Sequence, residues 1–227
     1  YTHFGDPTFA YERAESQVIG TAVMRLADAP VLPFDFEGFA DTIKKYLSNV
    51  QELLDTNQAE IKERNAEIAD SVFNAISDPT EPLSPPPSAV VPPHFNFAPL
   101  QNAVEALSES AGRLSTAWNK AQSNGWDLPS ATIARINLLL MQSGPALTDA
   151  VGLPHRPWFK NMIYAPGAYT GYEAKPLPGV LEALDRKAWD EAESQVPRAA
   201  EALRREVKII DQVTAALGGE KAVSAGQ

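Results

Sequence analysis

Apolar residues recur at helical spacing along most of this chain. In residues 97–124 and again in residues 196–217 they are separated by alternating steps of four and three residues. Such a pattern places one apolar seam along an α-helix, so both segments are predicted to be long helices. The seams consist of Leu100, Val104, Leu107, Ala111, Leu114 and Trp118 in the first segment and of Val196, Ala200, Leu203, Val207, Ile210, Thr214 and Leu217 in the second. Pro197 falls within the second seam, where we expect a kink or the start of the helix.

Three further helices are predicted from shorter apolar patterns. The first begins at Asp6 and Pro7, which suit an N-cap and a first helical position, and it ends near Asp28. A second long helix covers residues 39–76, with a more polar second half, and another begins near Pro129. No repeat of 20 to 50 residues and no long period-2 run is present, so nothing in the pattern predicts an extended sheet.

Two segments interrupt the helical pattern. Eight of the 19 prolines fall in residues 79–99, which we interpret as a Pro-rich crossover between two helices, with an SH3 or WW ligand as the less favoured interpretation. Residues 152–178 are rich in proline, glycine and aromatic residues and follow no period, which predicts a long irregular loop where a functional site is expected. The whole chain, 1–227, is therefore predicted to be a single all-α domain, a bundle of long antiparallel helices with this crossover and this loop.

Charge and composition exclude several classes of function. The chain carries 29 Asp and Glu against 19 Lys and Arg, a formal net charge of −10, which argues against nucleic acid as a partner. It contains no cysteine, so thiolate metal sites, cysteine nucleophiles and disulfides are excluded. No apolar run is long enough to span a bilayer, and we expect no membrane span.

The sequence contains no recognisable catalytic or metal-binding motif. Its three histidines, His3, His94 and His155, are isolated from one another, whereas a zinc site needs several ligands at short spacing. The carboxylates lie in mixed-charge runs such as residues 60–67, which are typical of a solvated helix face. We therefore expect no catalytic residue, no metal site and no cofactor in this chain.

Three segments resemble a known family. Residues 152–166 read GLPHRPWFKNMIYAP, residues 177–184 read LPGVLEAL and residues 26–35 read LADAPVLPFD. In their order along the chain, these segments resemble the C-terminal domain of glutamate carboxypeptidase II and its relatives, which in the transferrin receptor is called the dimerisation domain. Because the chain begins at Tyr1 rather than at methionine, we interpret it as part of a longer protein.

The resemblance implies a division of labour within a larger enzyme. Family members are co-catalytic zinc carboxypeptidases or aminopeptidases whose metal ligands belong to a separate peptidase domain. It implies that this chain is not an enzyme by itself, that it mediates homodimerisation and contacts the peptidase domain of the same chain, and that zinc is bound outside it. The compartment is undetermined by the residues, and only the resemblance suggests an extracytoplasmic, periplasmic or secreted, location.

The resemblance also implies a substrate-binding loop. In the family, a Lys-Tyr pair after the Tyr-Ala-Pro motif binds the C-terminal glutamate of the substrate. Tyr172 matches the tyrosine, Gly171 stands at the lysine position, and Lys175 is a candidate replacement for the missing ammonium. Alternatively, Tyr172 only packs the loop against the domain. For the whole chain, the alternatives are a non-enzymatic, transferrin receptor-like protein-binding ectodomain and an unrelated helical bundle.

Overall fold

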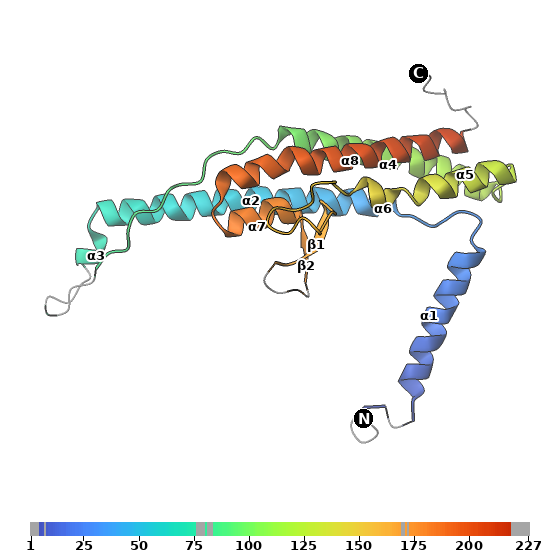
Figure 1. Cartoon of the computed structure of the whole chain (residues 1–227), viewed down its shortest axis with the longest axis horizontal. Coiled ribbons are helices and arrows are strands. Elements are labelled where there is room, and N and C mark those ends of the chain that lie inside the picture. Colours follow the sequence, from blue (N-terminus) through green and yellow to red (C-terminus); the bar gives the residue numbers. More distant parts are fainter. Residues whose placement is uncertain are drawn as a thin grey trace.

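The chain folds predominantly into α-helices, which confirms the predicted all-α class (Figure 1). The computed structural model describes residues 5, 6, 8–75, 80, 84–168, 171 and 173–218. Its long bundle helices are α2 (Phe36–Ala69), α4 (Ala98–Ser123) and α8 (Trp189–Leu217). The remaining elements of the described residues are α1 (Ala10–Asp28), α3 (Val72–Ala75), α5 (Ser130–Leu140), α6 (Ser143–Ala146), β1 (Tyr164–Pro166), β2 (Ala174–Pro176) and α7 (Pro178–Asp185).

The core lies where α4 packs along α8, with α2, α5 and α7 against this pair. The predicted seam of α4 is buried from Leu100 to Leu114, and Trp118 is half-buried, so that the apolar stripe read from the sequence is the packed face. Helix α8 begins at Trp189, so of the two alternatives predicted for Pro197 the helix start is wrong, and the kink stays a prediction. Pro197 lies inside the helix and removes only one N–H donor, while the buried residues on either side of it hold α8 in place.

Helix α2 ends earlier than its apolar pattern predicts. After Ala69, the N–H of Ser71 donates to the Ile68 carbonyl, and Ser71 takes a φ of 56°, in the left-handed region. The chain then makes only the single turn of α3, Val72–Ala75. The prediction that one helix continues past Ala69 is therefore wrong, and Ile76, its predicted last residue, lies outside the described residues. Beyond Gln58 no residue of α2 is buried, so tertiary packing does not hold this end in one helix.

The Pro-rich segment runs back along α2 without secondary structure in residues 84–97 (Figure 1). Because these residues belong to no helix or sheet, their carbonyls need donors from elsewhere. The buried Gln58 amide donates to the carbonyls of Pro92 and Pro93, at 3.1 and 3.0 Å, and Asn65 exchanges two hydrogen bonds with Ala89. Helix α4 then starts at Ala98, so the last two residues of 79–99 are helical.

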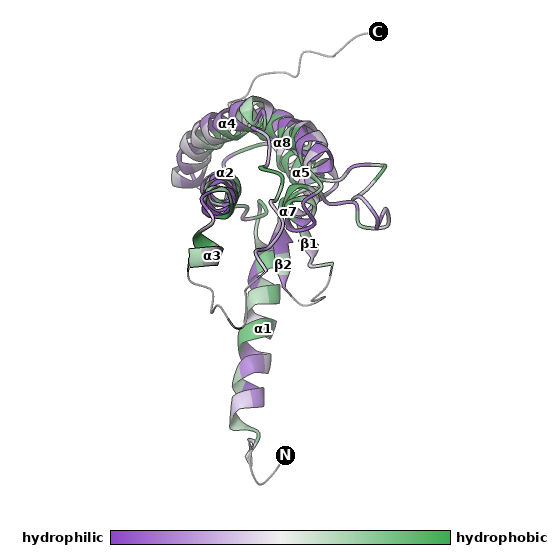
Figure 2. Cartoon of the chain, turned by 90° about the vertical axis from the view of Figure 1, so that its left-hand side faces the viewer, coloured by the Kyte–Doolittle hydropathy of each residue, from purple (hydrophilic) through white to green (hydrophobic). Residues whose placement is uncertain are grey.

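Helix α1 projects away from the bundle, as Figures 1 and 2 show from two directions. None of its residues is buried, and it exposes large apolar side chains, namely Tyr11, Val18, Ile19, Val23, Met24 and Leu26. The Asp6 carboxylate accepts the backbone N–H groups of Ala10, Tyr11 and Glu12 at 2.7 to 3.1 Å. Asp6 thus accepts the first N–H groups of the helix, but α1 starts at Ala10 with Phe9 at the N-cap position, so the predicted N-cap at Asp6 is wrong. Pro7 lies outside the described residues. None of the helices that the structure describes is long and apolar enough to cross a membrane.

Candidate functional site

The segment between α6 and α7 folds onto α8 and ends in a β hairpin. Strand β1 pairs antiparallel with β2, with Ala165 opposite Lys175 at the centre. Beneath it, a small apolar cluster joins the segment to Ala202 of α8 through Leu153, Met162 and Ala165. The segment predicted to be irregular therefore contains a short sheet. Each strand has only three residues, too few for a period-2 pattern to be recognised in the sequence.

Two arginines of α8 bind the backbone of this segment. Arg198 donates to the Gly152 carbonyl at 2.7 Å and forms an ion pair with Asp149 at 2.8 Å. The hydrogen bond from Arg198 is the largest of the influences that hold the pKa of Asp149 below its ordinary value. Arg205, two helical turns further along the same face, donates to the carbonyls of Ala146 and Thr148 at 2.9 and 2.6 Å. The sequence offers no signal for these contacts, because both arginines resemble ordinary surface charges.

A glycine makes the turn at the start of the family-like segment possible. Gly152 has a φ of 80°, and a Cβ placed on it would lie 2.3 Å from the Pro157 carbonyl oxygen. Any other residue would therefore force this turn apart. The turn positions Arg156, whose guanidinium lies over the ring of Phe159, at 4.7 Å from its centroid.

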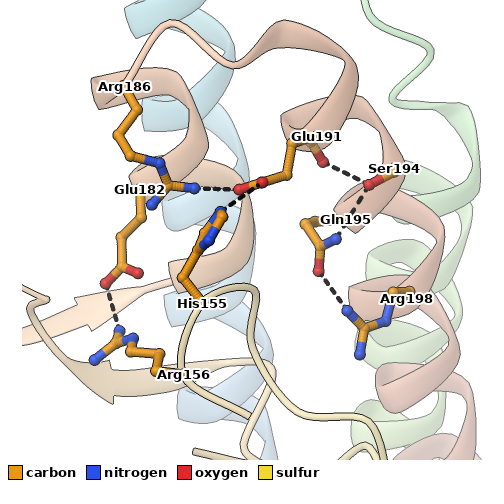
Figure 3. A network of polar contacts seen from close by, with 8 residues as sticks. All are labelled: His155, Arg156, Glu182, Arg186, Glu191, Ser194, Gln195 and Arg198. Carbon is orange, nitrogen blue, oxygen red and sulfur yellow. Dashed lines mark hydrogen bonds and ion pairs between the residues drawn. The ribbon is translucent and has the colours of Figure 1, made fainter.

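A buried ion pair connects the segment to α7 (Figure 3). The Arg156 and Glu182 side chains are only 8% and 5% exposed, and one guanidinium nitrogen of Arg156 pairs with Oε1 of Glu182. A second nitrogen of Arg156 donates to the Pro166 carbonyl, and the Ala168 N–H donates to the same Glu182 oxygen at 3.2 Å. Sequence reasoning missed this pair, because nothing in the spacing of residues 156 and 182 indicates that they meet.

The histidines of the described residues do not form a metal site. His94 is exposed, and His155 lies on the surface with its Nε2 2.9 Å from a carboxylate oxygen of Glu191 (Figure 3). Arg186 pairs with the other oxygen of Glu191, so this carboxylate is already shared by two partners. His3 lies outside the described residues. Within the part of the chain that the structure describes, no three His, Asp or Glu side chains are grouped so that they could hold a metal ion.

The predicted substrate-binding residues fall around the hairpin. Tyr172 lies outside the described residues. Gly171 has a φ of 68° and open space where a side chain would be, and Lys175 of β2 pairs with Asp185 of α7. A pocket of about 210 Å³ is lined by Gly167, Ala168, Glu173, Ala174, Lys175, Pro176 and Leu181. The structure thus brings Lys175, but not Gly171, to the wall of this pocket.

Comparison with known proteins decides the family. Residues 95–211, just over half of the chain, match the transferrin receptor-like dimerisation domain. The chain belongs to this family. The transferrin receptor-like dimerisation domain seen here includes the hairpin, α7 and most of α8, so the resemblance predicted from the GLPHRPWFKNMIYAP segment is confirmed.

Several curated relatives of this chain carry the names of peptidases. The chain is 26% identical over 208 residues to a probable glutamate carboxypeptidase of Arabidopsis thaliana, an alignment that covers 88% of the chain and 24% of that protein. It is 26% identical over 200 residues to a probable glutamate carboxypeptidase of Arthroderma benhamiae, with 88% and 23% covered. It is 21% identical over 220 residues to an aminopeptidase of Rattus norvegicus, with 93% and 24% covered. The chain spans about a quarter of the length of these relatives.

Proposed function

We propose that this chain is the C-terminal helical domain of a glutamate carboxypeptidase-like zinc peptidase, in which it mediates homodimerisation and lends its hairpin to the substrate pocket. The observation that carries the proposal is the family match over residues 95–211, which includes the hairpin and the helices beneath it. Relatives named as glutamate carboxypeptidases and as an aminopeptidase support a peptidase parent over a receptor-like one. The single domain 1–227, with the crossover 79–99 and the substrate loop 152–178, forms part of the same proposal.

Zinc belongs to the proposed peptidase domain and not to this chain. The described residues offer no grouping of ligands for it, so this chain contributes binding and orientation. When bound in the peptidase domain, zinc would activate the attacking water and polarise the scissile carbonyl. Under this proposal we expect the chain by itself to hydrolyse no peptide.

The hairpin is proposed to bind the C-terminal residue of a peptide substrate. Tyr172 contributes a phenol that donates to a substrate carboxylate. Lys175 already pairs with Asp185, but an ammonium carries three N–H donors, so Lys175 can also donate to a substrate carboxylate without losing this partner. Gly171 has no side chain to pair with an acidic group, so we expect the substrate's terminal carboxylate, rather than a glutamate side chain, to be recognised.

Helix α1 is proposed to contact the peptidase domain of the same chain. A 19-residue helix without one buried residue, and with several large apolar side chains in water, lacks the packing that stabilises most helices in proteins. An apolar surface of this kind is typical of a helix that is covered by another unit. The proposed peptidase domain of the parent provides that unit.

The test uses the full-length protein that carries this chain. We expect it to contain zinc, measured by mass spectrometry, and to hydrolyse N-acetylated dipeptides in a reaction that a chelator stops. Tyr172→Phe should raise KM about tenfold or more, because a hydrogen bond to a charged group is lost. The same variant should leave the hydrolysis of C-terminally amidated peptides unchanged. Arg113→Gln, which breaks an exposed ion pair with Asp211 between α4 and α8, is the control.

Two results would contradict the proposal. Chelator-sensitive hydrolysis by the 227-residue chain alone would place the catalytic centre within it. A full-length protein that neither binds zinc nor cleaves any of the peptides would favour the receptor-like alternative.

A further inference from the structure

Both arms of the β hairpin are held by carboxylates of one short helix, α7. The first arm is bound by the buried Arg156–Glu182 pair: Arg156 donates to the Pro166 carbonyl, and Glu182 accepts the Ala168 N–H. The second arm is bound through Lys175, which pairs with Asp185 one turn further along α7. Helix α7 itself packs on α8. The hairpin is therefore attached to the bundle at points that strand pairing alone would not provide.

The hairpin needs such attachment. Strands β1 and β2 have three residues each, and a two-stranded hairpin of that size is marginally stable in water at best. The apolar cluster of Ala165 with Ala202 of α8 and the two ion pairs with α7 supply further constraints. Of these two ion pairs, Arg156–Glu182 is buried, whereas Lys175–Asp185 is partly exposed and is weakened by solvent.

The buried pair acts directly on the wall of the pocket. The Ala168 N–H, which donates to Glu182, belongs to one of the residues that line the 210 Å³ pocket. Leu181, the neighbour of Glu182 on α7, lines the same pocket. A shift of Glu182 would therefore move the first arm relative to the second arm, which carries the pocket residues Glu173 and Lys175.

A buried ion pair is a weak source of net folding stability. Replacing both members of a buried ion pair by apolar residues is often neutral for folding, because the cost of removing two charges from water offsets their attraction. Removing one member leaves an uncompensated charge and is costly. The double replacement therefore separates a role in geometry from a role in folding.

We propose that Glu182, together with Arg156, positions residues 166–168 beside the substrate pocket and so sets the affinity for the C-terminal residue of the substrate. This inference rests on the proposed function of the hairpin. Neither residue contacts substrate, and both act through the backbone of the first arm.

The experiment compares four variants of the full-length protein. Glu182→Gln removes the charge, and Arg156→Lys removes the second donor, since one ammonium does not replace a forked guanidinium. The double variant Arg156→Met with Glu182→Leu removes the anchor without leaving a buried charge. Arg113→Gln is the matched control, because it breaks an exposed ion pair with Asp211 between α4 and α8.

We expect the first three variants to raise KM for N-acetylated dipeptides about tenfold, because the arm is misplaced. Their kcat should stay within about twofold of the wild type, as for a loss of binding that is equal in ground and transition states. C-terminally amidated peptides should show no change, and Arg113→Gln should behave as the wild type. In the 227-residue chain, the amide hydrogen of Ala168 should exchange faster in the double variant than in the wild type.

The possible failures are distinguishable. A wild-type protein that cleaves nothing, or that does not distinguish acids from amides, contradicts the proposed function. If the wild-type protein distinguishes acids from amides but the double variant keeps the wild-type KM and the wild-type exchange rate of Ala168, only the positioning role is overturned. If the single variants have a lower thermal unfolding midpoint while the double variant keeps the wild-type KM, the pair has a purely structural role, and the inference is also overturned.

Discussion

Glu206 is a buried acid on the packed face of α8. It is fully buried between the core residues Leu203 and Ile210, and Ser143 of α6 donates to its Oε1 at 2.6 Å. Its Oε2 has no hydrogen-bond partner among the described residues. Burial therefore raises the pKa of Glu206, against the smaller lowering effect of the Ser143 hydrogen bond.

This raised pKa makes the stability of the domain depend on pH. Between the unfolded pKa, about 4.3, and the higher native pKa, the native state binds more protons than the unfolded state, so the free energy of unfolding falls as pH rises. Glu206→Gln cannot titrate and should remove this fall, so its stability relative to the wild type increases with pH. Urea denaturation from pH 4.5 to 8 measures the effect, with the exposed Glu201→Gln as control.

Equal pH slopes for the wild type and Glu206→Gln would show that Glu206 is not the titrating group. Asp149 does not interfere, because its pKa is lowered and its contribution to stability is lost only as pH falls below the range of the experiment.

At the scale of elements, α1 and α2 depend on their caps to different degrees. Asp6 accepts three backbone N–H groups of α1, and Asp35 accepts the N–H of Gly38 at the start of α2. Helix α2 buries seven residues, whereas α1 buries none. Only α2 can therefore compensate for a lost cap by packing.

We expect Asp6→Ala to unfold α1 in the 227-residue chain without changing the unfolding midpoint of the bundle. The lost cap costs about 0.5 to 2 kcal/mol, a large fraction of the stability of an unpacked helix. Amide exchange in residues 10–28 should become faster. In Asp35→Ala, the matched control, the bundle midpoint should fall while α2 stays helical. Unchanged exchange in Asp6→Ala would mean that contacts outside the helix stabilise α1.

Element prediction succeeded where local pattern and packing agree. The α4 seam from Leu100 to Leu114 is apolar, regular and buried, so the residues that its periodicity selects are the residues that pack in the core. It failed at Ser71, where the apolar pattern continues but the backbone turns left-handed, and at the hairpin, whose strands are too short to show a period. At the site, Lys175 was named only as a candidate replacement for the lysine that the family has at position 171, and its role in binding stays a prediction. The Arg156–Glu182 pair was not predicted, because no local rule connects residues so far apart in the chain.

At the scale of the whole molecule, the three methionines report which surfaces are covered. Met24 of α1 is 62% exposed, Met141 after α5 is 61% exposed, and Met162 under the hairpin is 1% exposed. In the 227-residue chain, hydrogen peroxide should oxidise Met24 and Met141 rapidly and Met162 slowly, because oxidation follows exposure. In the full-length protein, Met24 should become as slow as Met162, because we propose that the peptidase domain covers α1.

Peptide mass spectrometry after graded oxidation measures all three rates in one sample. Met162 serves as the internal control for folding in both proteins. Equally rapid oxidation of Met24 in the two proteins would show that α1 does not contact the peptidase domain.

By itself, the sequence determined the helical class, the seam of α4, the first part of the α8 seam from Val196 to Leu203, and the family, because each depends on residue identity at short spacing. Only the tertiary structure decided that α1 stands apart, that α8 arginines bind the segment before the hairpin, and that α7 holds both hairpin arms. These features join residues distant in the chain, and the burial that gives their polar contacts strength exists only once the helices have packed.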